Sequence, residues 1–82
     1  NVEEVNKVLE EYSVRYIIIH NYDPKIESYG YKIKYQKAND FKKFIEYINT
    51  MEDIQFSFKM IFIDDEITVY KVQKISREFN EA

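Results

Sequence analysis

The sequence predicts a small α+β fold: a two-layer sandwich with a mostly antiparallel, four-stranded sheet and two helices on one face. Three observations favour this class. Two stretches repeat apolar residues at helical spacing, four others have the alternation or the β-branched content of strands, and together they follow the order α-β-β-α-β-β. Because the chain has 82 residues, we expect residues 1–82 to form a single domain.

Both helices are predicted from apolar stripes. Residues 2–12 ("VEEVNKVLEEY") place acids and a lysine between apolar side chains at helical spacing. The stretch "NDFKKFIEYINTM" has its stripe at i, i+3, i+4 and i+7, and Asn39 or Asp40 can cap its start. We expect the sheet to bury Val2, Val5, Leu9 and Tyr12 of the first helix, and Phe41, Phe44, Ile45 and Ile48 of the second.

The first strand is predicted over residues 14–21. Its run Ile17-Ile18-Ile19 is β-branched and apolar on both faces, which favours a central strand that is covered on each side. We expect the helices to cover Ile17 or Ile18. Pairing should stop before Pro24, because proline cannot donate to a ladder.

The second strand is predicted over residues 29–36 ("YGYKIKYQ"), which alternate cleanly. Tyrosines and Ile33 share one face, whereas lysines, the glycine and a glutamine share the other. This pattern is typical of a half-buried strand, and the lysines suit a sheet edge, where they discourage unwanted pairing.

The last two strands are predicted to form a hairpin. Residues 54–63 ("IQFSFKMIFI") alternate so that Phe56 and Phe58 face the core, and "EITVYKVQ" returns after a turn at Asp64-Asp65. The run Asp64-Asp65-Glu66 lacks the spaced acids and the glycine of a calcium loop, so we interpret it as a turn and predict no metal site.

Composition argues against several functions. The net charge is −3, and lysines are interspersed with glutamates, so the chain lacks the clustered positive charge that nucleic-acid binding needs. There is no cysteine and hence no thiolate metal site. The longest apolar runs are far shorter than a bilayer span of about 20 residues. No motif in the sequence indicates a cofactor.

His20 and Asp23 are the residues to consider for catalysis, since they lie three apart where a strand ends. A histidine beside a carboxylate can act as a general base. The alternative is a polar strand terminus, with Asn21 and Asp23 forming a turn ahead of Pro24. Because no nucleophile, phosphate loop or second histidine accompanies the pair, we predict no catalytic residue.

The abundant tyrosines are the candidate binding residues. Eight tyrosines in a chain with a single leucine can simply fill the core. A surplus that remains exposed would instead form a docking surface, because small domains rarely expose a large apolar patch unless something covers it. The residues we expect in such a surface are Tyr22, Tyr29, Tyr35 and Tyr70.

Two stretches carry a family resemblance. "EEYSVRYIIIHNYDP" resembles a segment near the C-terminus of archaeal polytopic membrane proteins, where a short helix leads into a strand. "DDEITVYKV" is similar to the closing strand of the same regions. The proteins are dolichyl-phosphate-mannose-dependent glycosyltransferases and related membrane proteins. In them this region resembles a small soluble domain after the last membrane helix.

The resemblance implies a non-catalytic domain. The catalytic acids of that family lie in a loop between early membrane helices, which nothing here matches, so no catalytic residue is carried over. We expect an extracytoplasmic piece of a longer chain, which fits a start at Asn1 rather than methionine. It would pack on the membrane-embedded part of its parent or help present an acceptor, and the isolated fragment would self-associate. The alternative is a free-standing cytoplasmic α+β protein-binding module.

Overall fold

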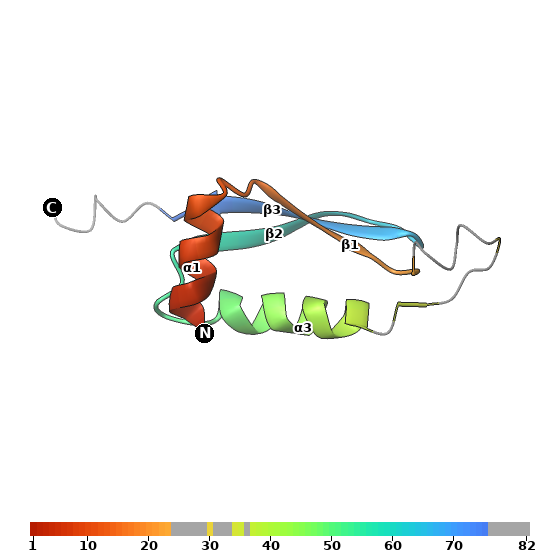
Figure 1. Cartoon of the computed structure of the whole chain (residues 1–82), viewed down its shortest axis with the longest axis horizontal. Coiled ribbons are helices and arrows are strands. Elements are labelled where there is room, and N and C mark those ends of the chain that lie inside the picture. The colour runs from red at the N-terminus through yellow and green to blue at the C-terminus, as the bar shows by residue number, and fades with distance from the viewer. Residues whose placement is uncertain (24–29, 31–33, 36, 76–82) are drawn as a thin grey trace, which may run out of the picture.

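A computed structural model describes residues 1–23, 30, 34–35 and 37–75. Its two helices and antiparallel sheet confirm the predicted α+β class. In chain order the elements are α1 (Val2–Glu11), β1 (Tyr16–His20), α3 (Lys37–Asn49), β2 (Phe56–Ile63) and β3 (Ile67–Lys74). The sheet order is β1-β3-β2; α3 runs along one face of the sheet, and α1 rises at one end from the level of α3 toward the strands (Figure 1).

The prediction of four strands in the order α-β-β-α-β-β is not matched, because the described residues form three strands. Most of the predicted second strand, residues 29–36, lies outside the described residues. Within that stretch Lys34 forms an isolated antiparallel bridge with Tyr22, and the Tyr35 amide donates to the Asn21 carbonyl at 2.7 Å.

Among the described strands β1 lies at an edge of the sheet, which contradicts the prediction of a central strand. The central strand is β3, which pairs with β1 on one side and with β2 on the other. Side chains alternate along β1, so Ile17 and Ile19 face α3 while Ile18 faces away from it. Ile19 is buried, Ile17 is half-buried and Ile18 is 55% exposed. An apolar run on both faces therefore did not mean that both faces are covered.

The core lies between the sheet and the helices. The predicted burial of Phe56 and Phe58 is confirmed, whereas Phe41 and Phe44 remain exposed although they belong to the apolar stripe of α3. Thr68 is fully buried in the central strand, and its hydroxyl has no hydrogen-bond partner among the described residues. The buried apolar residues are Leu9, Ile19, Ala38, Ile45, Ile48, Ile54, Phe56, Phe58, Tyr70 and Val72.

Helix ends set the path of the chain into and out of the core. Helix α1 ends when Ser13 adopts a left-handed conformation (φ 49°), and the Val14 amide donates back to the Leu9 carbonyl at 3.1 Å. This turn directs the chain into β1. Helix α3 begins at Lys37, so Asn39 and Asp40 lie inside its first turn instead of capping it as predicted.

The hairpin between β2 and β3 confirms the predicted turn. The Asp64 carboxylate accepts hydrogen bonds from the amides of Glu66 and Ile67, both at 2.8 Å, which stabilises the reversal. Residues near the end of β1 hold the turn in place: the Asn21 side-chain amide donates to the Asp65 carbonyl at 3.1 Å, and the Tyr22 hydroxyl lies 3.1 Å from the Asp65 carboxylate.

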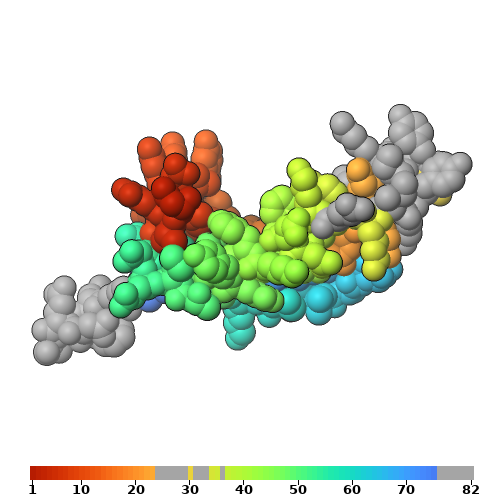
Figure 2. Space-filling model, turned by 90° about the horizontal axis from the view of Figure 1, so that it is seen from below, coloured from red at the N-terminus to blue at the C-terminus, as the bar shows by residue number. Residues whose placement is uncertain are grey.

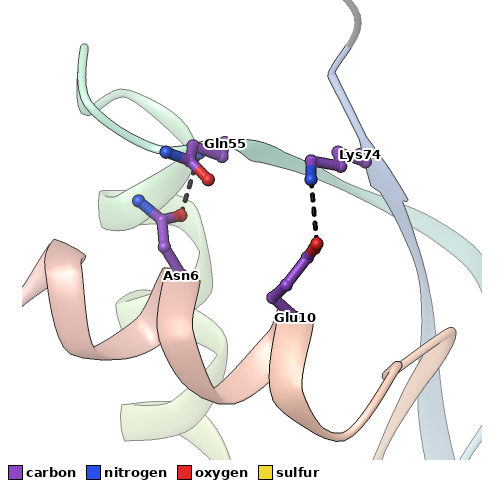
Figure 3. Close-up of polar contacts among 4 residues, drawn as sticks. All are labelled: Asn6, Glu10, Gln55 and Lys74. Atoms are coloured by element: carbon purple, nitrogen blue, oxygen red, sulfur yellow. Dashed lines mark hydrogen bonds and ion pairs between the residues drawn. The ribbon is translucent and has the colours of Figure 1, made fainter.

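Asparagine side chains bond to the backbone at one point of the outer edge of β2 and just before the strand. Asn49, at the end of α3, donates to the Phe58 carbonyl at 2.9 Å and accepts from the Phe58 amide at 3.2 Å. Asn6 of α1 accepts from the Gln55 amide at 2.9 Å (Figure 3). At Phe58 the Asn49 amide group takes the place of a residue of a neighbouring strand. The Lys74–Glu10 ion pair in the same view, at 3.0 Å, is exposed and contributes little to stability.

The alternation along β1 predicts unequal costs for truncating its isoleucines. Ile19→Ala should lower the free energy of unfolding by about 2–5 kcal/mol, because it opens a cavity in the core. Ile18→Ala should cost less than about 1 kcal/mol, because Ile18 is largely exposed. Urea denaturation of both variants measures the difference, and equal costs would contradict the face assignment.

Candidate functional site

The candidate site is an apolar groove of about 650 Å³ between α1, β1 and α3. Its size lies in the range of sites that bind small molecules or side chains. Figure 2 shows the molecule hollowed between α1 (red) and the beginning of α3 (yellow-green). The groove is lined mainly by Val5 and Leu9 of α1, Ile17 and Ile19 of β1, and Phe44 and Ile45 of α3.

The groove exists because α3 has more apolar surface than the sheet covers. Ile45 is buried under the sheet, whereas its neighbour Phe44 and, one turn earlier, Phe41 are 46% and 47% exposed. The Phe41 ring contacts Tyr35, with ring centroids 6.5 Å apart at an interplanar angle of 45°. These three rings therefore form an aromatic wall on the side of the groove away from α1.

Helix α1 forms the opposite wall. Its C-terminal half brings buried Leu9 against the core, and half-buried Val5 packs beside it. Asn6, one residue after Val5, is bonded to the chain that enters β2: its side chain accepts from the Gln55 amide and donates to the Asp53 carbonyl. These two hydrogen bonds fasten α1 to the segment that joins α3 to β2. The position of the α1 wall of the groove is therefore set by tertiary contacts.

His20 and Asp23, the pair considered for catalysis, both line one end of the groove. His20 is exposed, and its side chain makes no hydrogen bond to any described residue; Asp23 is half-buried. No group of three histidine, aspartate or glutamate side chains within residues 1–23 and 37–75 could hold a metal ion. The pair supplies a polar boundary to a largely apolar site.

The four tyrosines predicted as a docking surface do not come together. Tyr35 is 37% exposed and lines the groove, whereas Tyr22 is half-buried with its hydroxyl on the Asp65 carboxylate. Tyr70 is 4% exposed and lies in the core. Tyr29 lies outside the described residues. Of this set, Tyr35 is the one that the structure places at the candidate site.

Sequence reasoning missed that Phe41 and Phe44 are groove residues, since their spacing with Ile45 and Ile48 matches an ordinary buried stripe. One signal was available. The apolar stripe of α3 contains two phenylalanines one helical turn apart. Their two rings have more apolar area than the isoleucines of a single edge strand can cover. Using that signal requires knowing that β1 is an edge strand.

The phenol of Tyr70 has a raised pKa. Burial raises the pKa of its phenol above the ordinary value of 10.0, and the nearby Glu46 carboxylate raises this pKa further. Both effects disfavour the phenolate, because a buried charge loses hydration and a second negative charge repels it. Tyr70 therefore packs in the core as a neutral phenol.

Comparison with known proteins adds no family. A scan against family models found no match, and searches of curated proteins and of solved structures found none either. Neither helix within the described part of the chain has the length and hydrophobicity needed to cross a membrane.

The raised pKa of Tyr70 predicts a loss of stability in alkali. Below about pH 10 both folded and unfolded chains hold this proton; as the pH rises through the folded-state pKa, the unfolded chain has already released it and is favoured. Tyr70→Phe should therefore lose less free energy of unfolding than the wild type between about pH 8 and pH 11. Urea denaturation of both proteins at the two pH values measures these losses. The other tyrosines titrate in both proteins, so the difference between the two losses reports on Tyr70. Equal losses of unfolding free energy in the two proteins would contradict the prediction.

Proposed function

We propose that this chain is a non-catalytic interaction domain whose groove receives an apolar segment of a partner. The observation that carries the proposal is the groove itself. It brings apolar side chains of three elements around one hollow, with Phe41 and Phe44 about half exposed on its wall. Exposed aromatic surface of this kind is characteristic of surfaces that a partner covers.

The size of the exposed rings indicates what a partner would gain. Fully burying one large apolar side chain contributes about 1.5–3 kcal/mol relative to leaving it in water. Covering Phe41, Phe44 and the rim of Tyr35 would thus contribute a substantial part of a binding free energy. Because His20 and Asp23 are polar and lie at one end, they would orient an occupant more than they would attract it.

The partner we propose is the membrane-embedded part of a longer, glycosyltransferase-like parent chain, with this domain on the extracytoplasmic face. Support comes from the resemblance of "EEYSVRYIIIHNYDP" and "DDEITVYKV" to the domain that follows the last membrane helix in such proteins. The first of these stretches contains β1, which lines the groove. A free-standing module would use the same groove on a separate protein.

The groove predicts selective effects of substitutions on α3. Nile red, a neutral apolar dye, should bind the wild-type domain with increased fluorescence, and Phe44→Ser should weaken this binding about tenfold, because the ring forms the groove wall. Tyr47→Ser is the matched control: Tyr47 is an aromatic residue of the same helix that is 60% exposed and lies outside the groove. Equal effects of the two variants would contradict the assignment of the groove.

The same pair of variants tests the proposed partner in the full-length parent. Phe44→Ser should lower the melting temperature of the parent, or its transfer activity, whereas Tyr47→Ser should leave both unchanged. If both variants behaved as the wild type there, docking on the parent's own membrane part would be wrong. The parent gene should also encode apolar spans of about 20 residues upstream of this region.

A further inference from the structure

Strand β1 exposes its backbone along the groove. Hydrogen bonds at its two ends show which residues face β3: the Arg15 carbonyl accepts from the Val72 amide at 2.8 Å, and the Asn21 amide donates to the Glu66 carbonyl at 2.9 Å. Pairing in an antiparallel ladder alternates, so Ile17 and Ile19 also bond to β3. The amides and carbonyls of the intervening residues, Tyr16, Ile18 and His20, consequently point away from the sheet.

This edge opens directly onto the groove. Four consecutive residues of β1, from Ile17 to His20, line it, although their side chains point to opposite faces. The groove therefore reaches the strand edgewise. No described strand pairs with this side of β1 over Tyr16–His20. On the opposite edge of the sheet, the Asn49 side chain already bonds to both backbone groups of Phe58.

Charge differs between the two ends of β1. Past His20 lie four carboxylates, those of Asp23 and of the adjoining turn from Asp64 to Glu66, together with two lysines, Lys34 and Lys42. At the start of the strand, Arg15 is exposed and Lys71 of β3 lies opposite Tyr16. A strand that ran antiparallel to β1 would place its N-terminal end beside the acids and its C-terminal end beside the bases.

We propose that the groove binds an extended peptide that adds to β1 as an antiparallel strand, with a basic residue at its N-terminal end, an acidic residue at its C-terminal end and apolar residues at alternate positions. This inference rests on the proposed function of the groove and gives the conformation and the charges of the segment that occupies it. Residues of the peptide opposite Ile17 and Ile19 point into the groove, because directly opposed residues share a face. Residues opposite Tyr16 and Ile18 exchange backbone hydrogen bonds with them.

The probe is a synthetic peptide of about seven residues, Lys-Ile-Thr-Val-Thr-Ile-Glu, which spans the free edge of β1. In the proposed register its first isoleucine and its valine lie opposite Ile19 and Ile17 and enter the groove, and its threonine amides bond to β1 at Ile18 and Tyr16. Methylating both threonine amide nitrogens should weaken binding at least about tenfold, whereas methylating the amides of the valine and the last isoleucine should change it less than about threefold. The peptide with its lysine and glutamate exchanged should bind more weakly, because both charges then face like charges.

Two protein variants test the same contact from the other side. Ile18→Pro removes an amide that points away from β3, so the pairing of β1 with β3 keeps its hydrogen bonds. Ile18→Thr also loses the apolar side chain but keeps that amide. Peptide affinity should fall at least about tenfold in the proline variant and less than about threefold in the threonine variant. Backbone amide spectra of each free variant establish that it is folded.

The outcomes separate this inference from the proposed function. Equal binding of the two methylated peptides would overturn strand addition and leave the groove as a docking site. If Nile red bound but the peptide did not, strand addition would again be overturned, and the groove would remain a docking site. If neither Nile red nor the peptide bound, both proposals would be overturned. If the free chain sedimented as a dimer that the peptide did not dissociate, the edge would belong to a second copy, and the peptide proposal would be wrong.

Discussion

The antiparallel pairing of β1 with β3 is the constraint on which the rest of the structure depends. It joins a strand near the start of the chain to the last of the described strands, and it places β1 at the edge of a sheet whose other two described strands form a hairpin. Ile17 and Ile19 then lie toward α3, because side chains alternate along the strand. Since no described strand pairs with the outer side of β1 over Tyr16–His20, the apolar stripe of α3 extends past the sheet, and the groove follows from that excess.

The two edges of the sheet differ in a way that bears on function. An unprotected edge offers unpaired amides and carbonyls to any extended chain, so proteins usually cover or charge it. Here the Asn49 side chain bonds to both backbone groups of Phe58 at the edge of β2, and Asn6 bonds to the amide of Gln55 just before that strand. The edge of β1 has no such cover among the described residues over Tyr16–His20, and the strand itself contains no lysine, arginine, aspartate or glutamate. This asymmetry favours one site of strand addition over the other.

Binding and stability are coupled in a domain of this size. A chain of 82 residues buries a modest fraction of its surface, so each large apolar side chain left in water forfeits a noticeable share of the available stabilisation. Phe41 and Phe44 are left in this state, and the buried Thr68 hydroxyl lacks a partner among the described residues. An occupant of the groove that binds the folded state alone would stabilise the domain by mass action. Thermal stability is therefore a direct measure of whether the groove is filled.

Local periodicity was sufficient to predict the α+β class, both helices, the strand around Ile18 and the hairpin that turns at Asp64, because these features depend on residues close together in the chain. Burial of Phe58 was predicted for the same reason. Tertiary structure decided that β1 lies at the edge, that Ile19 rather than Ile18 enters the core, and that Phe44 lines a groove. Each of these outcomes depends on which strand pairs with β3 and on how far α3 extends past it, and both are set by contacts between residues that are distant in sequence.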